Sequence, residues 1–163
     1  MATSTTLQMV SAKEIVLLRK TPSGISKLNK PHAESFSTYY FATINWFLLG
    51  TPRPEPEGNP LAAALAGYET INTTSLENGS FRLITLDQIS DIAQALEKVD
   101  LTKLRKDVQS ADAAALAKKA VGDFELLAKE DSPAATIVTD VKQLTSFYRN
   151  AAAKHLGVVL YTV

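Results

Sequence analysis

Residues 36–67 read FSTYYFATINWFLLGTPRPEPEGNPLAAALAG and hold the strongest structural signals of the chain. Its first half is aromatic and aliphatic, and its apolar residues recur at spacings of three and four. This periodicity predicts a buried helix over residues 33–49. Gly50 follows and can adopt the left-handed conformation in which many helices end.

The second half of the stretch predicts a loop and another helix. Residues 51–58 contain three prolines and two glutamates, which favours a stiff and exposed connection. Asn59 is a good N-cap, and Pro60 suits the first helical position. A short alanine-rich helix should therefore begin there and end at Gly67.

Both ends of the chain predict strands. Residues 5–10 and 158–163 are rich in apolar and β-branched side chains, as strands usually are. Between them, residues 68–71 and 81–84 flank a polar segment with an Asn-Gly pair at 78–79, a strong hairpin signal. These segments predict a small, mostly antiparallel sheet with strands from both termini.

Helices fill most of the remaining chain. Ser11 and Thr85 each precede a glutamate or glutamine by three residues, which is the spacing of a capping box. Residues 110–129 are alanine-rich and predict a helix, and a last helix should begin at Pro133 and end at Gly157. We therefore expect one α+β domain over residues 1–163, in which several helices cover the sheet.

Composition excludes several classes of protein. Lys+Arg and Asp+Glu both number 17, so the basic excess of a nucleic-acid-binding protein is missing. No cysteine is present, which excludes thiol catalysis, disulfides and cysteine zinc sites. The N-terminus has no signal-peptide pattern, and no apolar run is long enough to span a membrane. We expect a soluble cytoplasmic protein without nucleic-acid or membrane partners, present as a monomer or weak homodimer.

Basic residues gather near the N-terminus. Five lysines and arginines fall within the first thirty residues, against one acid. They can form a solvated face or a docking patch for an acidic partner. The sequence leaves both interpretations open.

No catalytic pattern occurs in the sequence. The two histidines, His32 and His155, have no partner at metal-binding spacing. Phosphate-binding glycine loops and nucleophile-elbow motifs are missing. Asp87 and Asp91 share a helical face, but it is the expected solvent side. We predict no catalytic residue, metal or cofactor, and we lean against an enzyme.

The predicted aromatic helix offers one candidate site. Asn45 is a polar residue within this apolar segment. It is either a core amide with satisfied hydrogen bonds or part of a pocket beside Tyr39, Tyr40 and Trp46.

The proline-rich loop offers a second candidate site. Arg53, Glu55 and Glu57 alternate with its prolines. They belong either to a plain connector or to a preformed charged probe for a protein partner. The second alternative has a physical basis, because a restricted backbone loses less entropy on binding.

Several short motifs carry a resemblance to a known family. Within the stretch they are Phe47-Leu48-Leu49-Gly50, Asn59-Pro60-Leu61 and Leu65-Ala66-Gly67. On either side of it lie MVSAKEIVLLRKTP at 9–22, FRLITLDQISDIAQALEKVD at 81–100 and TDVKQLTSFYRNAAAKHLGVVLYTV at 139–163. On these segments the chain resembles the YfbM-like family of small bacterial proteins of unknown function.

The chain also departs from the family's pattern. Phe41 stands where the family has a Trp, Asn45 where it has a His, and Leu49 where its turn has a Thr. The family's Tyr-Pro before the last long helix is absent, with residues 124–127 in that region. A site built on that histidine would lack its ionisable group here, which counts against an inherited catalytic role.

Two hypotheses of function follow. The first is a non-catalytic binding protein of the immunity type, which neutralises a bacterial toxin by direct contact; it rests on analogy with other small bacterial domains. The second is a small-molecule enzyme or ligand-binding protein with a pocket at the aromatic helix. An adjacent toxin gene would favour the first hypothesis, and a metabolic operon the second.

Overall fold

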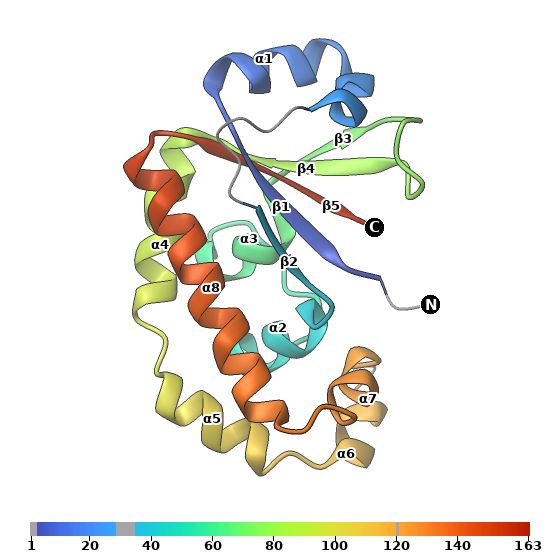
Figure 1. Cartoon of the computed structure of the whole chain (residues 1–163), viewed down its shortest axis with the longest axis vertical. Coiled ribbons are helices and arrows are strands. Elements are labelled where there is room, and N and C mark those ends of the chain that lie inside the picture. Colours follow the sequence, from blue (N-terminus) through green and yellow to red (C-terminus); the bar gives the residue numbers. More distant parts are fainter. Residues whose placement is uncertain (1–2, 29–34, 120) are drawn as a thin grey trace.

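A single antiparallel sheet forms the centre of the molecule. The computed structural model describes residues 3–28, 35–119 and 121–163. In these residues the strands lie in the order β2-β1-β5-β4-β3 (Figure 1), and β1 and β5 from the two ends of the chain pair side by side. The strands are β1 Thr5–Val10, β2 Ser35–Thr38, β3 Glu69–Asn72, β4 Ser80–Ile84 and β5 Gly157–Thr162. The predicted α+β class, with sheet strands from both termini, is confirmed.

Helices cover the two faces of the sheet unequally. Figure 1 shows α1 and the short helix η1 apart from the other helices, whereas α8 runs beside α4 and α5 along the molecule. None of the helices in the described part of the chain combines the length and apolar character needed to cross a membrane. The helices are α1 Ala12–Lys20, the 3-10 helix η1 Pro22–Lys27, α2 Phe41–Leu49, α3 Pro60–Ala66, α4 Leu86–Glu97, α5 Leu101–Gln109, α6 Ala113–Lys118, α7 Asp123–Leu127 and α8 Pro133–Ala153.

The sheet divides the core into two clusters because successive side chains of a strand point to opposite faces. On β1, Leu7 and Met9 belong to the larger cluster, which includes Leu144 of α8. Val10 belongs to the smaller cluster, together with Ile15 of α1. The long helices therefore cover one face, and α1 with η1 covers the other.

The prediction of a helix over residues 33–49 is wrong for the first half of that range. Residues 35–38 form β2, in which exposed serines alternate with a buried Phe36 and Thr38. This alternation has the period of a strand, and β2 pairs with β1. The helix α2 begins only at Phe41, and residues 33–34 lie outside the described residues.

Two other helix predictions need correction. Residues 110–129 form two short helices, α6 and α7, instead of one. The last helix ends at Ala153, and the left-handed residue after it is His155, with φ 53°. Gly157, expected to end that helix, is the first residue of β5.

Predictions that rest on local capping are confirmed. Ser11 forms the capping box that begins α1, and Thr85 forms the one that begins α4. Asn59 accepts a hydrogen bond from the third residue of α3. Gly50 ends α2 in the left-handed conformation, with φ 76°. Each of these signals involves groups only a few residues apart.

Candidate functional site

A hollow of about 520 Å³ lies where the turn between β2 and α2 meets the proline-rich loop and α7. Tyr39 of the turn lines it, with 51% of its surface exposed. Arg53 of the loop also lines it, as do Glu125 of α7 and Lys129 just beyond that helix. We call this site the Tyr39 hollow. It gathers an exposed aromatic ring, two cations and carboxylates.

One carboxylate of the Tyr39 hollow holds α2 in place. Asp123 accepts hydrogen bonds from the backbone amides of Ala42 at 2.9 Å and Thr43 at 3.0 Å, and from the Thr43 hydroxyl. The first amides of a helix have no partner within it, and Tyr40 at the N-cap supplies no side-chain hydrogen bond. Burial raises the pKa of Asp123, although its hydrogen bonds oppose the shift. Asp123 is therefore a positioning residue for α2.

Two more carboxylates hold the turn between β2 and α2. The Thr38 hydroxyl donates to Asp140 of α8 at 2.7 Å and accepts from the Tyr40 amide at 3.0 Å. The Tyr40 hydroxyl donates to Glu130 at 2.8 Å. Burial raises the pKa of Asp140. Burial and then the hydrogen bond to Glu130 raise the pKa of Tyr40 to about 12.

The raised pKa of Tyr40 predicts a loss of stability in alkali. Above pH 10 the Tyr40 side chain of the unfolded chain loses its proton, whereas the folded chain keeps it until about pH 12. Its contribution to stability is therefore complete below pH 10 and is lost as the pH rises through about 12. We expect Tyr40→Phe to unfold with a weaker dependence on pH over this range than the wild type, in urea titrations at several pH values.

A second variant tests the cause of this pH dependence. Glu130→Gln keeps the tyrosine but removes the charge that opposes its ionisation. Its pH dependence should lie between those of the wild type and Tyr40→Phe. If the stability of the wild type and that of Tyr40→Phe fell in the same way between pH 10 and about 12, the loss would not come from Tyr40.

The residues of the predicted aromatic pocket are dispersed in the structure. Of the four, only Tyr39 lines the Tyr39 hollow. Tyr40 is buried, and Asn45 is buried with its side-chain amide donating to the Pro52 carbonyl at 3.4 Å. Trp46 is partly buried, and the ammonium of Lys119 lies 6.0 Å from its ring centre.

The charged residues of the proline-rich loop are separated in the same way. Arg53, Glu55 and Glu57 are all exposed. Arg53 lines the Tyr39 hollow, but neither glutamate is among its lining residues. The structure thus brings together Tyr39 and Arg53, which belong to two different candidate sites predicted from the sequence.

Sequence reasoning missed the contribution of α7. Asp123, Glu125 and Lys129 fall within the alanine-rich segment that was predicted to be one continuous helix. Gly122, which weakens a helix, was a signal for a break there. No pattern in the neighbouring sequence indicates that Asp123, which follows this break, caps a helix about 80 residues away in the chain.

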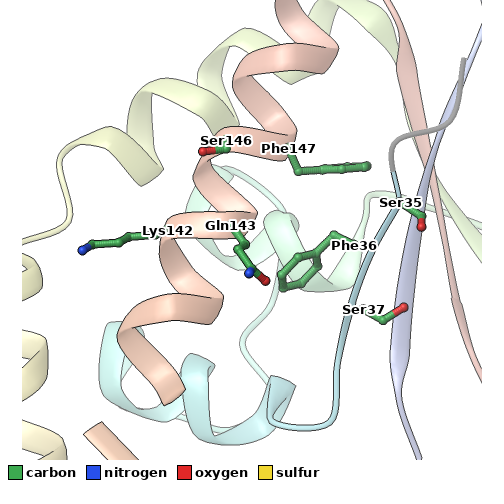
Figure 2. Close-up of a pocket in the computed structure, with 7 residues that line it drawn as sticks. All are labelled: Ser35, Phe36, Ser37, Lys142, Gln143, Ser146 and Phe147. Atoms are coloured by element: carbon green, nitrogen blue, oxygen red, sulfur yellow. The ribbon is translucent and has the colours of Figure 1, made fainter. Parts of the chain in front are cut away.

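A second hollow, also of about 520 Å³, lies between β2 and α8 (Figure 2). Its lining combines hydroxyl and amide groups with two phenylalanine rings. In Figure 2 the Gln143 side chain points toward Phe36, whereas Lys142 extends away from β2. It gathers fewer charged groups than the Tyr39 hollow, which remains our candidate site. The residues that line the second hollow are Ser35, Phe36, Ser37, Lys142, Gln143, Ser146 and Phe147.

No metal site is evident in the described ranges, where no three histidine or acidic side chains are placed to hold an ion together. The carboxylates around the turn between β2 and α2 instead accept hydrogen bonds from protein groups. Asp123, Glu130 and Asp140 each have a donor within α2, β2 or the turn between them.

Comparisons with known proteins give a family and a fold. A family model described as "Domain of unknown function (DUF1877)" matches residues 1–161. The crystal structure of YfbM from Escherichia coli, a protein of unknown function, is similar over 98% of this chain and 99% of that one. The two are 16% identical in sequence, with a TM-score of 0.67, which shows a shared fold. A search of the curated proteins finds no match.

Proposed function

Because this chain belongs to the DUF1877 family of unknown function, we propose a function from its own geometry: it is a non-catalytic binding protein that engages a protein partner at the Tyr39 hollow. The observation that carries the proposal is the meeting of exposed Tyr39 with Arg53 and Lys129 around one concave surface. Tyrosine and arginine are enriched among the residues that contribute most to protein interfaces.

Three of the carboxylates in or near the hollow already accept hydrogen bonds from protein groups, which supports binding over their use in acid–base catalysis. The Asp123 carboxylate accepts hydrogen bonds from backbone amides of α2, and the Glu130 carboxylate accepts one from the Tyr40 hydroxyl. Asp140 is occupied by the Thr38 hydroxyl. Each holds the backbone that presents Tyr39, so the surface is preorganised, and a preorganised surface loses less entropy on association.

The proline-rich loop extends this surface. Arg53 belongs to the Tyr39 hollow, and the exposed Glu55 and Glu57 follow it along the chain. We expect the partner to place an acidic group opposite Arg53 and Lys129, and basic groups opposite the two glutamates. Such complementary charges speed encounter and select the partner.

In its finer form, the proposal is that the partner is a bacterial toxin and that this chain is an immunity-type protein. The toxin's basic cleft would then receive Glu55 and Glu57, which would deny it to the toxin's substrate. Co-expression with a toxin from the same genome tests this form, because the chain should restore growth and the variants described below should not.

A small-molecule ligand is the second candidate function. Its support is the volume of the Tyr39 hollow, about 520 Å³, which lies within the range of ligand pockets. Arg53 and Lys129 would favour an anionic ligand. Titration with phosphate and with citrate, followed by amide NMR, tests this function. Saturable shifts of amide signals that are confined to the residues lining the hollow would favour a ligand-binding function.

The binding proposal predicts which substitutions abolish the interaction. We expect a partner that is captured by the immobilised wild-type chain to be lost with Tyr39→Ala and with Arg53→Glu. In titrations of the purified partner, each change should weaken binding about tenfold or more, as is usual for central interface residues.

Two controls make the result decisive. The exposed Val163→Ala changes a terminal side chain outside the hollow and should bind as the wild type does. Exchange of Glu55 and Glu57 for lysine should weaken binding and reduce its dependence on salt. A partner that binds Tyr39→Ala and Arg53→Glu with wild-type affinity would contradict the proposal.

A further inference from the structure

Two large aliphatic side chains are exposed next to each other on α1. Val16 is 49% exposed and Leu17 is 54% exposed. Their helix buries Ile15 and Leu18 against the sheet, so these two side chains remain on its outer side. Clustered exposed apolar side chains are more informative than isolated ones, because they mark interaction surfaces.

A hollow of about 360 Å³ lies beside Leu17, between α1 and η1. Leu17, Leu18 and Leu28 supply its aliphatic lining, Lys27 supplies a cation and Glu14 supplies a carboxylate. Its volume is at the lower end of the range for binding pockets. We call it the Leu17 groove, and its size suits one or two inserted apolar side chains.

Lysines surround the Leu17 groove. Lys13 and Lys20 lie four residues before and three residues after Leu17, and on a helix these spacings bring them to the same side. Lys13, Lys20 and Lys27 are exposed and form no ion pair with any described residue. In contrast, Arg19 forms an ion pair with Glu69, in which the guanidinium nitrogen lies 2.8 Å from the carboxylate oxygen. Three lysines therefore stand at the groove against one lining carboxylate, Glu14, which accepts a hydrogen bond from the Ser11 amide, so the rim carries a net positive charge.

We propose that the Leu17 groove is a docking site for an acidic segment of a partner protein, which inserts an apolar side chain beside Leu17 while its carboxylates face Lys13, Lys20 and Lys27. An apolar anchor in a pocket with complementary charges around it is a common arrangement at protein interfaces. The Leu17 groove and the Tyr39 hollow share no lining residue, and α1 and α7 lie at opposite ends of the molecule in Figure 1. This inference is therefore independent of the proposed function.

The charges favour this occupant over two others. A second copy of the chain docking through the same surface would bring its own lysines against Lys13, Lys20 and Lys27, and like charges repel. An anionic membrane would meet only the outer side of a short helix whose other apolar residues are already buried. Interfacial helices bury a broad apolar face instead.

The test uses synthetic peptides and the full-length chain. The main probe contains glutamates and has leucines at helical spacing; a second probe replaces each glutamate by glutamine, and a third replaces each leucine by alanine. We expect the main probe to shift the amide NMR signals of α1 and η1 saturably. The other two should bind at least tenfold more weakly, and added salt should weaken binding of the main probe.

Variants locate the binding site on the chain. Leu17→Ala should weaken binding of the main probe about tenfold, and the double change of Lys20 and Lys27 to glutamine should reduce the salt dependence. Because Leu17 is exposed, its replacement should leave the melting temperature unchanged. The matched control Val163→Ala removes part of an exposed aliphatic side chain outside the groove and should bind as the wild type does.

Other results would overturn the proposal. Equal binding of the glutamate and glutamine probes would show that the lysines play no part. Wild-type affinity in Leu17→Ala would place the peptide elsewhere. Binding to phosphatidylserine vesicles that depends on Leu17, without binding of the acidic peptide, would identify a membrane surface. Self-association that depends on Leu17 would identify a second copy as the occupant.

Discussion

Replacement of Gly157 by alanine is expected to lower the free energy of unfolding by about 3 kcal/mol, at the upper end of the usual cost of overpacking. Gly157 is buried at the start of β5, where it pairs with Val10. An added Cβ would lie 2.7 Å from the Ile84 carbonyl oxygen and 2.6 Å from Cδ1 of Ile15. The Ile15 side chain can rotate away, but the Ile84 carbonyl is backbone of the neighbouring strand. The sheet itself must therefore shift.

Chemical denaturation of the purified variant measures this loss, and Gly122→Ala is its matched control. At Gly122 an added Cβ would meet no atom within 4 Å, and φ is −66°. The control should be as stable as the wild type or slightly more stable, because alanine restricts the unfolded chain. Equal stability of the two variants would contradict the steric argument.

The second large effect is expected for Asp123→Ala, at about 2–4 kcal/mol. The change leaves the amides of Ala42 and Thr43 without their hydrogen-bond acceptor, and both residues are buried. Each buried donor left unsatisfied costs about 1–3 kcal/mol. We expect α2 to fray at its first turn, which would show as faster amide exchange at these two positions.

Asp100→Ala serves as the control for this change. Asp100 is exposed and caps α5 locally by accepting from the Lys103 amide at 3.0 Å. Loss of an ordinary N-cap costs about 1 kcal/mol. If Asp123→Ala costs no more than Asp100→Ala, the proposed role of Asp123 in holding α2 is wrong.

The contrast between these two aspartates shows what could be predicted about the candidate site. Asp100 precedes its helix directly, so its role is visible in the sequence. Asp123 caps a helix that begins 82 residues earlier in the chain, and no local pattern encodes that pairing. The gathering of Tyr39, Arg53 and Lys129 depends on the same contact, because Asp123 fixes α7 against the start of α2.

Elements whose signals are local could be predicted from the sequence. The capping boxes at Ser11 and Thr85 and the left-handed Gly50 involve groups within about one helical turn of each other. They were predicted correctly because their energetics do not depend on the rest of the fold. The α+β class followed from the order of these elements and from the apolar segments at both ends of the chain.

Elements that depend on partners far away in the chain became apparent only in the folded structure. The segment from Phe36 to Tyr40 has the apolar spacing of a helix, but pairing with β1 makes residues 35–38 a strand. Gly157 has the sequence context of a helix end, yet the approach of Ile84 and Ile15 leaves no space for a side chain there. In both cases contacts between segments far apart in the chain outweigh local preference, because burial and strand pairing contribute more free energy than intrinsic propensity does.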